Sequence, residues 1–454
     1  MSKLWQKQDT LDSMMQHYTV GNDYLLDQQL VIADVIGSVA HAKTLHKAHI
    51  LSLEELKELE KALAHVVSLV EKDSFPITEE DEDCHTAIEN SLVQHVGDVG
   101  KKIHTGRSRN DQVQTALRLW MRESCALMAK ETALLAQKLF TFASKWEMTP
   151  MPGRTHMQLA MPSSVGLWAS SFAEELLDET RHLLHVYTLL DQSPLGSAAS
   201  YGTPLNLNRS YAAQLLGFSK VQNNVLYANN SRGKFEAIFL DACDYVTLTL
   251  SKLAQDVMLF SLDEIGYFSL PPFLCTGSSI MPQKRNPDGL ELARSRSAVV
   301  SSCSQRIKAI IRSLPSGYNR DFQDTKEPLL VGVNAALLTV KIMGNMVEQL
   351  EVHTDKLLQG FRKEIYATDE VIKRLQEGGN FRDIYKEVGL DLESVGRYEP
   401  YVVVKSRLSE GTSGNLNLEG KMKEISTLLN QSENHIRVLE GVYNTLIKGV
   451  TTVV

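Results

Sequence analysis

Three long stretches contain neither proline nor glycine, and this feature constrains the fold of the chain more than any other. They span residues 107–149, 234–265 and 290–314. Because proline and glycine are the residues that most often interrupt helices, stretches of this length predict long helices. The first two carry wide apolar stripes at helical spacing, which are typical of helices buried on several sides at the centre of a bundle. The sequence therefore predicts an all-α fold, with 401–404 as the single candidate strand.

The pattern of helices and breakers predicts three helical domains. An N-terminal domain covers 1–106, a central long-helix bundle covers 107–355, and a smaller C-terminal domain covers 356–454. Loops held on rigid helices are common places for catalytic groups. The breakers gather in polar loops at 149–154, 193–204, 266–287 and 315–328.

Composition excludes several classes of protein. The 454 residues are 43% hydrophobic and 22% charged, with a net charge of −8, so no basic face for nucleic acid is expected. The five cysteines are scattered, which argues against both a zinc cage and a disulfide framework. No apolar run is long enough to span a bilayer, and the stretch 1–12 is too polar for a signal peptide. We therefore expect a cytoplasmic protein without a nucleic-acid or membrane partner.

The segment 276–288, TGSSIMPQKRNPD, joins two of the predicted helices. Gly277 permits unusual backbone angles and a close approach to a ligand. Exposed amides together with Lys284 and Asn286 would suit an anion such as a carboxylate. Composition alone leaves an anion-binding loop and a merely solvated loop equally open.

Three further polar segments precede or begin predicted helices. HTGRSRNDQ at 104–112 places donors on both sides of a helix N-cap, where free amides and the helix dipole favour an anion. PGRTHMQ at 152–158 contains His156, a side chain suited to proton transfer, although a lone histidine is more often structural. YNRDFQDTKE at 318–327 carries Tyr318, Gln323 and Lys326 at a roughly helical step, a pattern that a solvated face also explains.

The sequence offers no familiar metal or cofactor motif. The histidines at 41, 46, 49, 182 and 185 have no carboxylate or cysteine at ligand spacing. GxGxxG, Walker and GxSxG motifs are also missing, so a nucleotide cofactor and a serine hydrolase are unsupported.

Taken together, these segments resemble the fumarase/aspartase superfamily. GSSIMPQKRNP at 277–287 is similar to its signature loop, and HTGRSRNDQ is similar to the argininosuccinate lyase branch, as are the segments at 82–85, 193–196 and 314–318. The resemblance implies a homotetramer with a central twenty-helix core and active sites shared among three subunits. It also implies β-elimination of the small-molecule substrate argininosuccinate to arginine and fumarate, without cofactor or metal.

The resemblance also implies residue roles, within and around a catalytic loop at 273–288. Ser278 would be the general base, stabilised by Lys284 and loop amides, and His156 would be the acid or its relay, oriented by Glu291. Lys284 and Asn286 would hold the succinyl carboxylates together with Thr155, Ser108 and Asn110. The catalytic group so implied is Ser278, His156, Lys284, Glu291 and Asn286. The substrate-binding group so implied is Ser108, Arg109, Asn110, Thr155, His85, Tyr318, Gln323, Lys326 and Asp23.

Some positions depart from the family pattern, and two rival interpretations remain. Asp23 lies near a usual serine, Arg154 replaces a usual tyrosine, and Gly233 replaces an aspartate after Arg232. These changes concern recognition of the amino-acid end of the substrate. The rivals are another lyase of the superfamily, such as an adenylosuccinate lyase or a fumarase, and a catalytically silent, crystallin-like structural protein. The GRSRNDQ segment argues against the first, and retention of the catalytic group argues against the second.

Overall fold

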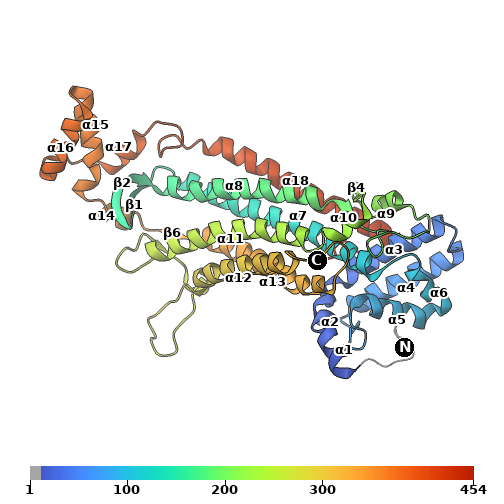
Figure 1. The fold of residues 1–454 in the computed structure, drawn as a ribbon. Helices are drawn as coiled ribbons and strands as arrows, with labels where there is room; N and C mark the ends of the chain where they lie inside the picture. The colour runs from blue at the N-terminus through green and yellow to red at the C-terminus, as the bar shows by residue number, and fades with distance from the viewer. Residues whose placement is uncertain (1–11) are drawn as a thin grey trace.

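Five long helices lying side by side dominate the computed structural model, which describes residues 12–454 (Figure 1). The residues 1–11, whose polarity underlies the expectation of no signal peptide, lie outside the described part. The predicted long helices at 107–149, 234–265 and 290–314 are confirmed, and the all-α prediction holds. The five helices are α7 (Arg109–Lys145), α8 (Val165–Leu190), α11 (Lys234–Phe260), α12 (Asp288–Ile311) and α13 (Lys326–Glu348).

The core of the bundle forms because these helices bury apolar residues against several neighbours. α7 packs against α8 and α13, while α11 packs against α8, α12 and α13. The segment Arg320–Glu348 is apolar and long enough to cross a membrane, yet 61% of its most apolar window is buried. Since α13 contacts α7, α11 and α12, it is a core helix of the bundle.

Smaller helices cover the two ends of the bundle (Figure 1). At one end the N-terminal helices pack around α3, which contacts α7, α4 and α5. At the other end, α15–α17 share a separate small core that includes Ile365, Val371, Val388 and Val403. The last long helix, α18 (Leu418–Leu446), returns along α7 and α8. The shorter helices are α1 (Ser13–Val20), α2 (Asp23–Leu26), α3 (Val31–Lys47), α4 (Leu53–Val70), α5 (Cys84–Val96), α6 (Asp98–Lys101), α9 (Arg209–Leu215), α10 (Val225–Asn230), α14 (Thr354–Gln359), α15 (Ala367–Glu377), α16 (Phe381–Leu390) and α17 (Pro400–Lys405).

The strands of the described chain are short and form two-stranded pairs. The largest is an antiparallel hairpin of β1 (Pro150–Thr155) and β2 (Gln158–Ser164), which connects α7 to α8. The minor pairs join β3 (Gln192–Ser193) to β4 (Lys220–Val221) and β5 (Phe268–Ser269) to β6 (Glu351–Val352).

The predicted strand at 401–404 is wrong, because this segment lies in helix α17. Pro400 occupies the first turn, where its missing N–H costs nothing, and the Glu399 carboxylate accepts the Val402 N–H at 2.8 Å. The Glu399 N-cap and Pro400 therefore favour a helix here, although the β-branched residues that follow favour a strand. The hairpin at 150–164 was missed because prolines and a glycine interrupt its apolar pattern.

Candidate functional site

A small cavity of about 50 Å³ lies where α2, the start of α7 and the start of α13 meet. Six of the residues assigned to substrate binding line it: Asp23, Arg109, Asn110, Tyr318, Gln323 and Lys326. They come from three distant parts of the sequence, so the fold itself brings them together. We call this cavity the head-group pocket.

Lys326 carries a positive charge at the base of the head-group pocket, although its side chain is almost fully buried. Its Nζ lies 2.6 Å from Oδ1 of Asp27 and 3.1 Å from Oδ2 of Asp23. Burial disfavours the ammonium, but the two carboxylates outweigh burial and raise the pKa of Lys326. For Asp23 burial is the larger influence, and it raises the pKa of that carboxyl despite the nearby ammonium.

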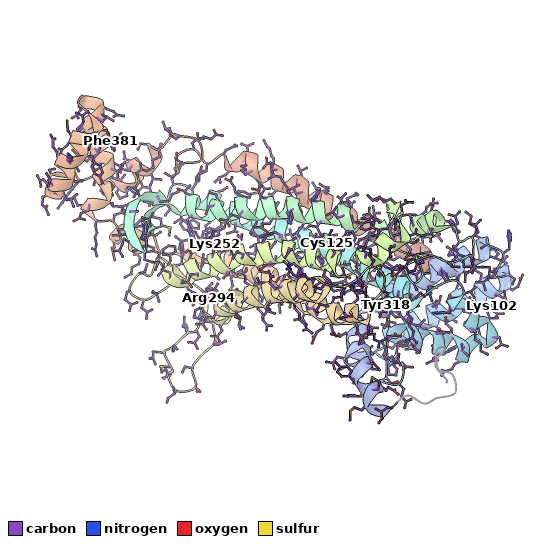
Figure 2. The ribbon with its side chains drawn as sticks, viewed as in Figure 1. Lys102, Cys125, Lys252, Arg294, Tyr318 and Phe381 are labelled. Atoms are coloured by element: carbon purple, nitrogen blue, oxygen red, sulfur yellow. The ribbon has the colours of Figure 1, made fainter. Side chains whose placement is uncertain are left out.

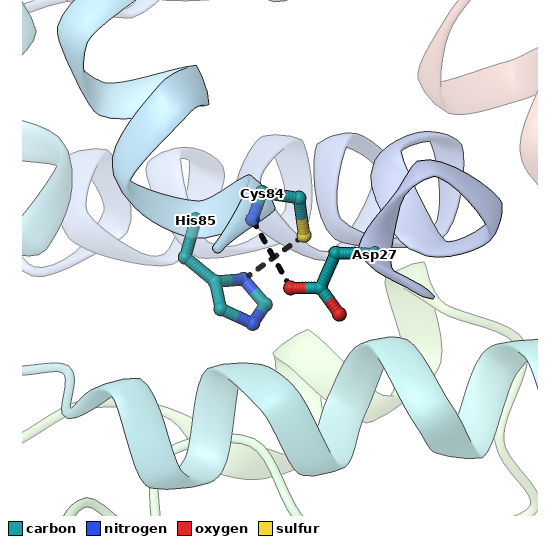
Figure 3. Close-up of side chains that lie close together, drawn as sticks. All are labelled: Asp27, Cys84 and His85. Atoms are coloured by element: carbon teal, nitrogen blue, oxygen red, sulfur yellow. Dashed lines mark hydrogen bonds between the residues drawn. The ribbon is translucent and has the colours of Figure 1, made fainter. Parts of the chain in front are cut away.

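His85 lies next to this ion pair, in a buried cluster with Asp27 and Cys84 (Figure 3). The Cys84 amide donates to Oδ2 of Asp27 at 3.1 Å, and Nδ1 of His85 lies 3.2 Å from Oδ1 of Asp34. Burial opposes the imidazolium, but the carboxylates of Asp34 and its neighbours outweigh that effect and raise the pKa of His85. His85 therefore lies in the electrostatic field of Asp27, the carboxylate that pairs with Lys326.

Asp27, Cys84 and His85 are residue types that can bind a metal ion, and their ligand atoms lie within 4.8 Å of one another. Both Asp27 oxygens are already engaged, one by Lys326 and the other by the Cys84 amide. Burial also raises the pKa of the Cys84 thiol well above its usual range, which disfavours the thiolate that metals require. The arrangement suits a buried ion pair better than a metal. Spacing arguments missed the cluster because Asp27 lies 57 positions from Cys84.

The start of α7 holds the wall of the pocket in place. Ser108 is the N-cap, and its hydroxyl accepts the Asn110 N–H at 3.2 Å. Oδ1 of Asp111 accepts the Ser108 N–H at 2.9 Å, and Oδ2 accepts the N–H groups of Gly196 and Ala198 at 2.9 and 3.0 Å. One carboxylate thus joins the 104–112 segment to the 193–204 segment.

The same 193–204 segment supports Tyr318. The Ser200 hydroxyl accepts the Tyr318 N–H at 3.1 Å. Arg109 is fixed from the opposite side, since its guanidinium lies 3.2 Å from Glu82 and 3.4 Å from Asp83. Sequence reasoning did not assign Arg232, which also lines the pocket; its position directly before the unusual Gly233 was the available signal.

Ser278, Lys284 and Asn286 lie elsewhere, in the 273–288 loop, which projects from the bundle between α11 and α12 (Figure 1). Oγ of Ser278 accepts the N–H groups of Met281 at 3.1 Å and Ile280 at 3.4 Å. The backbone of Asn286 pairs with Thr276 through hydrogen bonds of 2.8 and 3.0 Å, which close the base of the loop. Lys284 is exposed.

Thr155 and His156 lie at the exposed tip of the β1–β2 hairpin, and Glu291 is exposed in the first turn of α12. The two residues of the turn, His156 and Met157, have φ values of 53° and 62°. Such a turn usually contains asparagine and glycine, so the backbone is strained at the candidate acid.

A single chain does not bring the three groups of residues together. Tyr318 lies at one end of the α12–α13 pair, whereas Arg294, near the base of the loop, lies towards the other end (Figure 2). The hairpin tip is also at the end opposite the head-group pocket (Figure 1). Each chain therefore carries the head-group pocket at one end and the residues predicted to be catalytic at the other.

Comparisons with known proteins identify the family of the chain. A family model described as Lyase matches residues 6–301. The argininosuccinate lyase of Thermotoga neapolitana is 41% identical over 87% of this chain and 98% of its own length. That of Sorangium cellulosum is 40% identical over 92% of this chain and 97% of its own length.

Two solved structures show the same fold at lower identity. EDDS lyase in complex with formate superposes with a TM-score of 0.79 and 20% identity, covering 96% of this chain and 95% of its own. A class II fumarase from Schistosoma mansoni gives a TM-score of 0.70 at 18% identity, covering 87% and 95%. With the family model and the curated relatives in agreement over most of its length, the chain belongs to the argininosuccinate lyase family within the fumarase/aspartase superfamily.

Proposed function

We propose that this protein cleaves argininosuccinate to arginine and fumarate by β-elimination, without metal or cofactor, as a cytoplasmic enzyme of arginine biosynthesis. The observation that carries the proposal is 41% identity over 98% of the length of an argininosuccinate lyase, combined with a charged pocket formed by residues that match the family motifs. The reaction breaks one C–N bond and moves one proton from carbon to the departing nitrogen, so it needs a base, an acid and groups that stabilise negative charge.

Ser278 is the proposed base, which removes the proton from the carbon next to a succinyl carboxylate. A serine hydroxyl is a weak base, so its alkoxide must be stabilised. The amides of Ile280 and Met281 point at Oγ of Ser278 and would donate to the alkoxide, because both already donate to the neutral hydroxyl. Lys284 in the same loop would add a positive charge.

His156 is the proposed acid or relay that protonates the departing guanidino nitrogen, with Glu291 orienting its imidazole. The carbanion intermediate places extra charge on an already anionic carboxylate. Preorganised donors aimed at that carboxylate lower the barrier most. Asn286, Lys284, Thr155, Ser108 and Asn110 would supply them, whereas Tyr318, Gln323 and Lys326 would hold the arginine portion.

These groups can act on one substrate only if subunits assemble, so the proposal includes a homotetramer with active sites built from three chains. An exposed apolar groove of about 490 Å³ runs between α12 and α13. Leu292, Val331, Leu338 and Ile342 line it, with Leu338 59% exposed. A second copy of these helices would cover the groove and extend the bundle.

The proposed activity is tested by mixing purified protein with argininosuccinate and following fumarate absorbance in the ultraviolet. Adenylosuccinate and malate serve as comparison substrates, and sedimentation gives the oligomeric state. Fumarate release from argininosuccinate alone, by a tetramer, is the expected result. Release from adenylosuccinate or malate instead would assign another lyase activity, and no release from any substrate would favour a silent structural protein.

A further inference from the structure

Two exposed histidines from different helices lie ring against ring on the surface of the N-terminal part of the chain. His65 belongs to α4 and His95 to the last turn of α5, and these two helices pack against each other. Their ring centres are 4.6 Å apart, with an angle of 58° between the ring planes. Neither histidine lines the head-group pocket. The pair therefore needs an explanation separate from the proposed elimination.

The hydrogen bond of His95 decides which of its ring nitrogens is free. Its Nδ1 lies 2.8 Å from the Ser91 carbonyl oxygen. Because a carbonyl can only accept, Nδ1 carries the proton, and Nε2 of the neutral ring keeps its lone pair. Histidines that bind metals commonly donate their other ring N–H to a carbonyl in this way, which orients the ring and makes the ligand nitrogen more basic. His95 thus has the tautomer that presents Nε2 as a metal ligand.

The same ring nitrogen is free in His65. The Ser68 hydroxyl donates its single proton to the His65 carbonyl at 2.7 Å. The Ser68 oxygen also lies 3.5 Å from Nδ1 of His65, and in this longer contact it can only accept the Nδ1 proton. Both Nε2 atoms therefore have lone pairs, and no hydrogen bond within residues 12–454 engages either of them.

The separation of the two rings fits a pair of imidazoles on one ion. A transition-metal ion lies about 2.1 Å from a ligand nitrogen, and hence roughly 3.2 Å from the centre of that imidazole ring. Two imidazoles that meet at the ion at about 90–109° have ring centres about 4.5–5.2 Å apart. The observed 4.6 Å corresponds to the lower end, which is the right angle of octahedral or square-planar coordination.

Packed helices hold the two rings at this separation. Leu63 and Val66 are buried on either side of His65, and Leu92 is buried one turn before His95. Ligands on helices keep their geometry more precisely than ligands on loops. Within the described residues no third histidine, cysteine or carboxylate joins the pair at ligand distance. Water would therefore complete the coordination of an ion at this place.

We propose that His65 and His95 together bind a divalent transition-metal ion of the class of Ni²⁺ and Cu²⁺ through their Nε2 atoms. Imidazole suits these ions, whereas Mg²⁺ and Ca²⁺ prefer oxygen ligands. The ion would join α4 to α5, whose N-cap residue Asp83 lies 3.4 Å from Arg109 in the head-group pocket. It would stabilise a helix pair that supports the pocket without entering the elimination, so the inference does not depend on the substrate.

Calorimetric titration of the whole chain with NiCl₂, in a buffer without chelating groups, tests the proposal. His65→Gln and His95→Gln should each weaken Ni²⁺ binding at least about tenfold, because changes next to metal ligands already cost that much. The double variant should lose little more than either single variant, since both residues serve one site. MgCl₂ should not bind there. His182→Gln is the matched control and should change nothing, because this exposed histidine of α8 faces the Tyr245 ring and not a second imidazole.

Electron paramagnetic resonance of bound Cu²⁺ gives a second measurement. The spectrum should show coupling to two imidazole nitrogens in the native protein and to fewer in each single variant. Thermal unfolding without the ion should be unchanged, because both side chains are exposed. The inference is overturned if either single variant keeps the native Ni²⁺ affinity, because the two rings then do not share an ion. It is also overturned if His182→Gln weakens binding equally, since the ion then attaches to exposed histidines in general.

Discussion

The head-group pocket and the 273–288 loop differ in how far a single chain completes them. In the pocket, buried carboxylates, amides and cations hold one another at fixed distances, as Lys326 does with Asp27 and Asp23. In the loop, Ser278 and Asn286 bond only within the loop, and Lys284 is exposed. The fold of one chain thus preorganises the pocket residues, whereas the side chains of the loop are presented at the surface.

The largest effect is expected for Ser278→Ala, which removes the proposed base without touching the pocket. Turnover of argininosuccinate should fall by about 10³-fold or more, since general base catalysis alone contributes roughly 10²–10⁴-fold. The melting temperature should stay unchanged, because the side chain bonds only to the loop amides of Ile280 and Met281. Fumarate absorbance and thermal unfolding measure the two quantities. Ser279→Ala is the matched control; similar activity in both variants would remove Ser278 from the mechanism.

The second prediction compares the effects on stability of replacing two lysines, one buried in the pocket and one exposed in the loop. Lys326→Met should lower the free energy of unfolding by about 3–5 kcal/mol, because it leaves the buried Asp27 carboxylate without its cation. Lys284→Met, in the exposed loop, should change it by less than about 0.5 kcal/mol while lowering activity. Denaturant unfolding measures both. Equal stability losses in the two variants would contradict the difference between a preformed pocket and a surface loop.

A third prediction concerns pH. The pKa of His85 is raised above its ordinary 6.5 in the folded protein, because Asp34 and other carboxylates outweigh the effect of burial. A raised pKa contributes stability that is full below about pH 6.5 and is lost as pH rises through the folded value. The stability advantage of the native protein over His85→Gln should therefore shrink as pH rises above about 6.5. Denaturant titrations at several pH values follow it, and an advantage that grows with pH would contradict the assignment.

The smallest effect is expected at the strained hairpin. Met157→Gly should stabilise the fold by roughly 0.5 kcal/mol, because glycine adopts the positive φ of 62° without the strain that a side chain brings. Met161→Gly, within β2, is the control and should destabilise, since its backbone is extended. Thermal unfolding compares the two. A loss of stability in Met157→Gly would show that the turn is not strained.

Sequence reasoning predicted the long helices well because breakers are rare in them and their apolar spacing is regular. It failed at 401–404, where a proline and a glutamate cap produce a helix from β-branched residues. It also missed the β1–β2 hairpin, whose turn uses His156 and Met157 in place of the usual asparagine and glycine.

For the candidate site, motifs indicated which segments contain the polar residues, but not how these residues pair. Asp27 lies 299 positions from Lys326, and no local spacing reports such a contact. Arg232 was overlooked for the same reason, since its place in the pocket wall is visible only once the chain is folded. The proposed roles of Ser278, His156 and Glu291 come from the family resemblance, because no contact within the described chain joins these side chains to the pocket.

The hydrogen bonds of the Asp111 carboxylate affect how segments of the chain can be exchanged between members of the family. It binds the amides of Gly196 and Ala198 while capping its own helix, and Ser200 of that same segment supports Tyr318. Segments 104–112, 193–204 and 315–326 therefore form one interlocked unit. A chimera that takes only one of them from another member of the family would bring in a mismatched partner, whereas grafting all three together should keep the contacts among these segments intact.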